Sequence, residues 1–131
     1  MDLSEVLREA MQLAREQRAD EALVRLIEGL DSAREQKDDH ATALLSRNAA
    51  LICIQMGRLN EAAHFYHGAA QVEPKDAYTQ WALGDIYKAL GDVNLSQNHW
   101  DQFAKLAGES DDPELRELLC RHHLRVSGDA E

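Results

Sequence analysis

Apolar residues recur every three or four positions along most of this chain. Val6, Ala10 and Leu13 show this spacing near the start, and Leu83 and Ile86 belong to a similar run later on. Such spacing places apolar side chains on one face of a helix, whereas a strand shows alternation with a period of two. Because no stretch alternates for long enough to build a sheet, the pattern predicts an all-α fold.

Glycine, proline and capping residues divide this pattern into helices of similar length. Gly57 and Gly91 lie where one helix ends and another begins, which suits a left-handed C-cap. Asp2 and Asp39 have the side chain of an N-cap, and Pro113 follows an acidic segment, as proline does at a helix start. We therefore predict about seven helices, over residues 3–17, 20–36, 40–56, 59–72, 76–90, 93–107 and 113–126.

The middle of the chain repeats itself with an offset of 34 positions. This offset relates Gly57 to Gly91 and Tyr66 to Trp100. A period of 34 with two helices per unit resembles the tetratricopeptide repeat (TPR). The residues at the positions of that signature are Gly57, Ala62, Tyr66, Ala69 and Pro74 in one unit and Leu83, Gly84, Tyr87 and Gly91 in the next.

The resemblance implies a right-handed superhelical stack of about three helix pairs plus a C-terminal capping helix, in a single domain over residues 1–131. Its expected parts are a divergent unit (3–36), an insert (37–42), two repeats (43–76 and 77–110) and the capping helix (113–126). In the capping helix we expect an inward face and an outward face. The inward residues are Leu115, Leu118, Leu119 and His122, and the outward ones are Glu114, Glu117, Arg121 and Arg125.

Charge and composition narrow the choice of partners. The chain has 131 residues, which suits one domain, and its 24 acidic residues against 14 basic ones give a net charge of -10. This charge repels nucleic acids and anionic membranes. No apolar run approaches the roughly 20 residues that a membrane span needs. Cys53 and Cys120 lack CxxC spacing, so we expect reduced thiols in a cytoplasmic protein.

Motifs that carry chemistry are missing. The sequence has no glycine-rich phosphate loop, nucleophile elbow or HExxH pattern, so we expect no enzyme and no catalytic residues. His64 and His67 are spaced to share a helix face, but a zinc site needs further ligands. Cys53 occupies a central packing position of its repeat and is interpreted as a small core residue. We expect neither a metal ion nor a cofactor.

In TPR folds the first helix of each unit lines a concave surface. Carried over residue by residue, those positions form an apolar strip with cationic edges, which marks an interaction site. The strip consists of Leu7, Met11, Arg15, Leu44, Arg47, Leu51, Ile54, Gln55, Tyr78, Trp81, Asp85 and Lys88.

The resemblance also speaks against one class of partner. TPR co-chaperones bind the acidic C-terminus of heat-shock chaperones through a clamp of Lys, Asn and Arg side chains. Of the matching positions only Asn48 fits, and the others are Leu7, Met11, Tyr78 and Ala82. Without its cations such a clamp does not offset the desolvation of a terminal carboxylate.

The leading hypothesis is an adaptor or chaperone-like module that binds a partner peptide or protein segment of unspecified identity in this strip. In the alternative, the protein is structural: a second copy buries the strip in a homodimer, or the chain's own last helix covers it.

Overall fold

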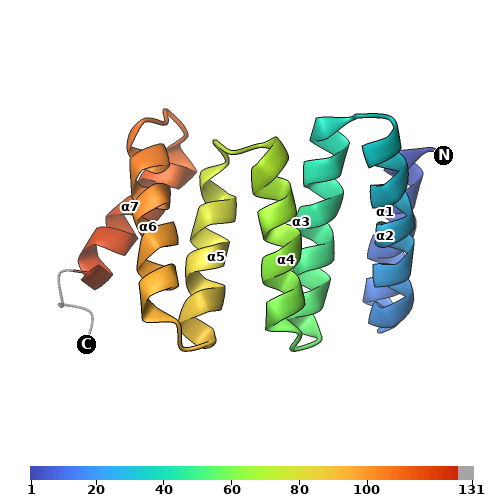
Figure 1. Cartoon of the computed structure of the whole chain (residues 1–131), viewed down its shortest axis with the longest axis horizontal. Helices are drawn as coiled ribbons and strands as arrows, with labels where there is room; N and C mark the ends of the chain where they lie inside the picture. The colour runs from blue at the N-terminus through green and yellow to red at the C-terminus, as the bar shows by residue number, and fades with distance from the viewer. Residues whose placement is uncertain (127–131) are drawn as a thin grey trace. The chain divides into compact units, whose positions relative to one another are not determined.

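A computed structural model describes residues 1–126 of the chain, and every regular element in that part is a helix (Figure 1). The all-α prediction is confirmed, and each helix end lies within two residues of its expected place. The helices are α1 (Leu3–Arg15), α2 (Ala19–Glu35), α3 (Asp39–Gln55), α4 (Leu59–Val72), α5 (Ala77–Ala89), α6 (Val93–Gly108) and α7 (Pro113–Val126).

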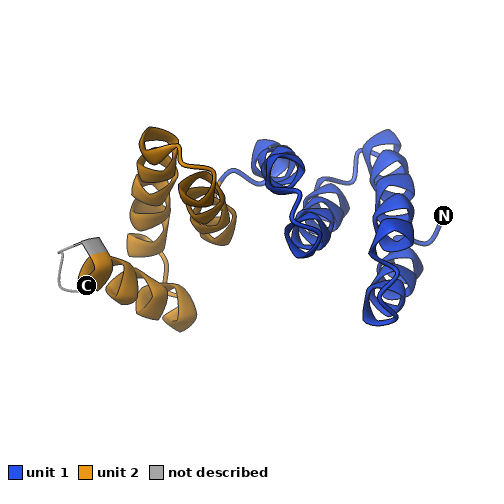
Figure 2. Cartoon of the chain, turned by 90° about the horizontal axis from the view of Figure 1, so that it is seen from below, with its two compact units in different colours: residues 1–74 blue, residues 75–131 orange. Residues whose placement is uncertain are grey.

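The helices fall into two compact units, coloured separately in Figure 2. Unit 1 spans residues 1–74 and contains α1 to α4, each packed against the next. Unit 2 begins at Lys75, and in it α5 packs on α6 and α6 on α7. The division after residue 74 lies two residues before the expected boundary between the repeats, which is after residue 76. The sequence predicts both repeats as parts of one domain.

Four helices end through the same left-handed turn. Gly57 and Gly91 take positive φ values of 75° and 86°, as a C-cap glycine does. Gln17 and Lys37 adopt the same region with φ of 64° and 55°, which costs a side-chain-bearing residue about 1–2 kcal/mol. At each turn the next N–H donates to the carbonyl five residues back: Arg18 to Leu13, Asp38 to Ala33, Arg58 to Cys53 and Asp92 to Tyr87. The divergent helix pair over residues 3–36 therefore makes the turn of the repeat without its glycine, once between its two helices and once at its end.

Residues 37–42, the expected insert, are divided between a linker and a helix. Gln36, Lys37 and Asp38 lie between α2 and α3, and Asp39 to Thr42 form the first turn of α3. Asp38, and not Asp39, is the N-cap: the left-handed turn at Lys37 leaves Asp38 extended, and its carboxylate accepts from the Ala41 N–H at 3.1 Å. Three more helices, α1, α5 and α6, begin with such an acidic cap, at Asp2, Asp76 and Asp92.

Small side chains occupy the places where paired helices cross. In unit 1, Ala50 and Ala62 are fully buried, and a Cβ added to Gly29 of α2 would lie 2.7 Å from the Val6 side chain of α1. Cys53 is fully buried beside them, and the loss of solvent raises the pKa of its thiol. It is the small core residue that the repeat predicted.

The tightest crossing is between α5 and α6 in unit 2. A Cβ on Gly84 would lie 2.1 Å from Cδ1 and 2.2 Å from Nε1 of Trp100, a separation that real atoms do not reach. The Ser96 hydroxyl of α6 also donates to the Gly84 carbonyl at 2.8 Å. Glycine is therefore required here by the approach of an indole, although its φ is that of an ordinary helix.

Substitution Gly84→Ala is expected to lower the free energy of unfolding by about 1–2 kcal/mol. The gain in helix propensity of about 1 kcal/mol is outweighed because Trp100 must leave its place. Urea denaturation followed by tryptophan fluorescence measures the change. Gly108→Ala is the control, because its Cβ would meet only Leu119 at 3.9 Å; a Gly84→Ala protein as stable as that control contradicts the packing described here.

Candidate functional site

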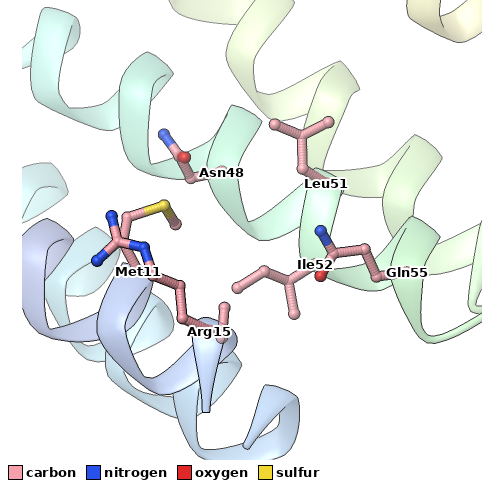
Figure 3. Close-up of a pocket in the computed structure, with 7 residues that line it drawn as sticks. Met11, Arg15, Asn48, Leu51, Ile52 and Gln55 are labelled. Atoms are coloured by element: carbon pink, nitrogen blue, oxygen red, sulfur yellow. The ribbon is translucent and has the colours of Figure 1, made fainter. Parts of the chain in front are cut away.

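A pocket of about 330 Å³ opens in unit 1 between α1 and α3 (Figure 3). Its apolar lining comes from both helices, with Met11 pointing from α1 and Leu51 and Ile52 from α3. Ile52 is almost completely buried, whereas Leu51 is 49 % exposed. The remaining lining residues are Ala14, Arg15, Asn48 and Gln55.

Helix packing explains why these two helices leave a pocket. Each uses its small or branched residues, such as Val6 and Ala10 in α1 and Ala49 in α3, to contact the other helices of the unit, and all three are fully buried. The long side chains of Met11 and Leu51 take no part in these contacts and line the pocket instead. No described residue covers Leu51 completely. The apolar surface that results is accessible from solvent.

The polar side chains around the pocket differ in the hydrogen bonds and ion pairs that they form within the protein. Asn48 donates through Nδ2 to the Leu44 carbonyl at 2.8 Å, which fixes its amide on α3. Arg15 donates to Gln12 Oε1 at 3.2 Å and forms no ion pair within the described part of the chain. Arg15 is the only charged residue in the lining, so its guanidinium gives the pocket a local positive charge within an acidic protein.

The other strip residues of unit 1 lie outside this pocket. Leu7 and Leu44 are half-buried, and Ile54 is 37 % exposed on α3. Arg47 is held inside the unit, because its Nη1 donates to Glu73 Oε1 at 3.0 Å and both side chains are largely covered. His40 contacts the other oxygen of Glu73 at 3.3 Å. Arg47 is thus engaged by a carboxylate of its own unit.

The strip residues of unit 2 are contacted by their own chain. Tyr78 donates its hydroxyl to Asp112 Oδ2 at 3.2 Å, and the loss of solvent together with Asp112 raises the pKa of the phenol. Trp81 is half-buried, with the His122 ring of α7 against it at 5.6 Å and 86°. Helix α7 therefore covers part of the strip on α5, one of the alternatives considered for the strip as a whole.

Arg125 makes a contact that the sequence did not predict. It is exposed, as expected, but its guanidinium also lies 4.7 Å from the Trp81 ring centre and 5.2 Å from that of Trp100. A cation over an indole is stabilised by the charge distribution of the ring, which accounts for this contact. Lys88 lies over Trp100 at 5.7 Å, and Asp85, exposed on the same helix, is close enough for Arg125 to act on its carboxyl.

The contacts Tyr78–Asp112 and Arg47–Glu73 were not predicted from the sequence, although the spacing of the first pair could have indicated it. Tyr78 and Asp112 are separated by 34 residues, the period of the repeat, so a residue pair at this offset could have been tested for contact. The Arg47–Glu73 pair has no regular spacing, and nothing in the sequence pointed to it.

Neither a metal-binding group of side chains nor a membrane-spanning helix occurs among the described residues. No group of three or more His, Cys, Asp and Glu side chains among them is arranged to hold a metal ion. His64 and His67 lie one helical turn apart on α4, and burial lowers the pKa of His67. None of the described helices combines the length and the apolar character of a membrane span.

Comparison with known proteins identifies the fold. The chain is similar to the crystal structure of the TPR domain of Arabidopsis FLU, with a TM-score of 0.72 and 19 % sequence identity over 82 % of this chain and 96 % of that one. The chain therefore has a TPR-like fold. No protein-family model and no curated protein sequence matches it.

The Arg47–Glu73 ion pair predicts a defined pH dependence. The hydrogen bond from Arg47 holds the pKa of the Glu73 carboxyl below its usual 4.5. The ion pair contributes fully to stability above the pKa that Glu73 has in the unfolded chain. This contribution is lost as the pH falls through the lower pKa that Glu73 has in the folded protein. We expect Glu73→Gln to cost about 0.5–1 kcal/mol at pH 7 and nothing at pH values below the folded pKa.

Urea denaturation followed by circular dichroism at several pH values tests this expectation. Glu5→Gln is the matched control, because Glu5 pairs with Arg8 at 3.4 Å on the exposed surface. A loss of stability in Glu73→Gln that is the same at pH 7 and pH 3 contradicts the assigned ion pair.

Proposed function

We propose that this protein is a non-enzymatic interaction module and that the pocket between α1 and α3 binds a segment of a protein partner. The observation that carries the proposal is the pairing of an open aliphatic side chain, Leu51, with a cation that has no acid partner in the described residues, Arg15. The TPR-like fold supports the same role, since such folds typically present helix faces to partner segments.

The apolar floor suits one anchoring side chain of the partner. Met11, Leu51 and Ile52 surround a space of about 330 Å³. A leucine- or phenylalanine-sized group buried there contributes about 1.5–3 kcal/mol through the loss of exposed apolar surface. Most of an interface's binding energy comes from a few such anchors.

Charge restricts what can lie beside that anchor. Arg15 at the rim favours a carboxylate of the partner, because an arginine and a carboxylate form two parallel hydrogen bonds. The net charge of -10 repels segments with many acidic groups. The expected partner is therefore a neutral or basic segment in which one Asp or Glu lies next to a large apolar residue.

A homodimer that buries the same pocket is the alternative. Two copies that each carry a charge of -10 repel one another, so charge favours a different partner.

The free thiols of Cys53 and Cys120 support a cytoplasmic setting, where thiols stay reduced.

Selection from a random peptide library displayed on phage tests the proposed pocket. With the natural chain we expect enriched peptides to contain a large apolar residue beside Asp or Glu. Arg15→Glu should replace the acidic preference by a Lys or Arg preference, and Leu51→Asp should lower the affinity of the selected peptides at least tenfold. Titration calorimetry with the synthetic peptides measures both effects.

Arg34→Glu makes the same charge change on α2, outside the pocket, and should leave the selected motif unchanged. If the Arg15→Glu and Arg34→Glu proteins select the same peptides as the natural chain, the pocket is not the binding site. A monomer–dimer equilibrium in light scattering that Leu51→Asp abolishes, with no peptide selected, identifies the homodimer instead.

A further inference from the structure

Helix α7 lies over an aromatic cluster formed by Trp81 of α5 and Trp100 and Phe103 of α6. Phe103 is fully buried, and the ring centres of Trp81 and Phe103 are 4.8 Å apart. Helix α7 contributes Leu115 to the core beside this cluster and places His122 against all three rings. The cluster is therefore completed by the last described helix.

His122 is an unusual residue for this position. It is only 4 % exposed, and its ring centre lies 5.6–5.7 Å from those of the three aromatic rings. Its Nδ1 is buried without a hydrogen-bond partner among the described residues. This atom gives up water when α7 docks, and a buried polar atom without a partner destabilises the state that contains it.

Few side chains hold α7 in place. Of residues 113–125, only Leu115 and His122 are buried, whereas α3 buries eight residues. Leu118 and Leu119 are partly covered, and Leu124 is largely exposed. His122 is therefore one of only two buried side chains that attach residues 113–125 to the rest of unit 2.

We propose that α7 is a releasable cover of the aromatic cluster and that proton uptake by His122 releases it. A proton from solvent converts the imidazole into an imidazolium with two N–H donors. Among the described residues no acceptor faces Nδ1, so the docked state would hold a buried donor and a buried positive charge. Release of α7 returns Nδ1 to water and exposes Trp81 and Trp100.

Most of the charged groups that act on His122 lower its pKa. On α7 itself, Arg125 and His123 disfavour a further positive charge, and on α5, Lys88 lies over Trp100. Asp101 of α6 acts in the opposite direction, and Asp85 of α5 lies near Arg125. Burial is the largest cause of the lowered pKa of His122, followed by Arg125.

The sign of the pH effect follows from this direction. Because the pKa of His122 with α7 docked lies below the ordinary value of 6.5, the released form binds the proton more strongly. Docking is complete above pH 6.5 and weakens as the pH falls through the lower value. Unit 1 contains no residue of this cluster, and its helices α1 and α2 carry no histidine, so these two helices should stay folded in that range.

Tryptophan fluorescence reports on this cover directly, because Trp81 and Trp100 are the two tryptophans of the chain. Between pH 7.5 and pH 5 we expect acrylamide quenching of the full chain to increase at least twofold. Hydrogen exchange should accelerate in α7 and not in α1 or α2. His122→Gln and His122→Phe, which cannot take up the proton, should show no such change with pH, while His123→Gln alters the exposed neighbour and should behave as the natural chain does.

The histidine titration of the natural chain, followed by NMR, decides the case even if both His122 variants fail to dock α7. A His122 midpoint below that of exposed His123 supports the proposal, and one above it overturns the proposal. It is also overturned if His122→Phe keeps the pH-dependent quenching or if α1 and α2 lose protection together with α7. None of these readouts involves the pocket between α1 and α3, so they are independent of the proposed function.

Discussion

Paired helices approach closely only where small groups meet, and this constraint organises both units. In unit 1, Ala50 and Ala62 occupy the crossing of α3 and α4 and are fully buried. In unit 2 the equivalent residues are Gly84 and Ser96, joined by a 2.8 Å hydrogen bond from the serine hydroxyl to the glycine carbonyl. Since the small residues take the contact positions, the longer side chains of the first helices must lie on other faces, where a partner or another part of the chain can meet them.

Strip residues on the first helix of each repeat then have different environments in the two units. Leu51 on α3 keeps half of its surface exposed, beside a cation with no acid partner in its unit. On α5, Trp81 is half-covered by His122 and Arg125 of α7. One repeat pattern thus provides both an open apolar pocket and an aromatic surface that the chain covers itself. The difference comes from α7, which packs on unit 2 through side chains that the repeat does not prescribe.

The sequence predicts the parts of the fold that depend on local chemistry. Helix periodicity, the left-handed glycines at Gly57 and Gly91 and the buried position of Cys53 follow from spacing alone. The left-handed turns at Gln17 and Lys37 do not, because these residues adopt the strained region only when the surrounding helices impose it.

The candidate site is less predictable, because its properties depend on contacts between distant residues. Positions carried over from the repeat include Leu51 and Arg15, but they cannot tell that Arg47 is bound by Glu73 while Arg15 has no acid partner in the described residues. The inward side of α7 was expected from its apolar residues. The contact of Arg125 with Trp81 was not, because the sequence does not show that an indole lies within reach of this long exposed side chain.

Hydroxyl-radical footprinting of the protein with a bound partner segment tests the central claim most directly. If the pocket between α1 and α3 receives the partner, Met11 and Leu51 become protected from oxidation at pH 7.5, while Val24, which is 59 % exposed on α2, reacts as in the free protein. Unchanged reactivity of Met11 and Leu51, with protection at Val24 or on the helices of unit 2, would contradict the account.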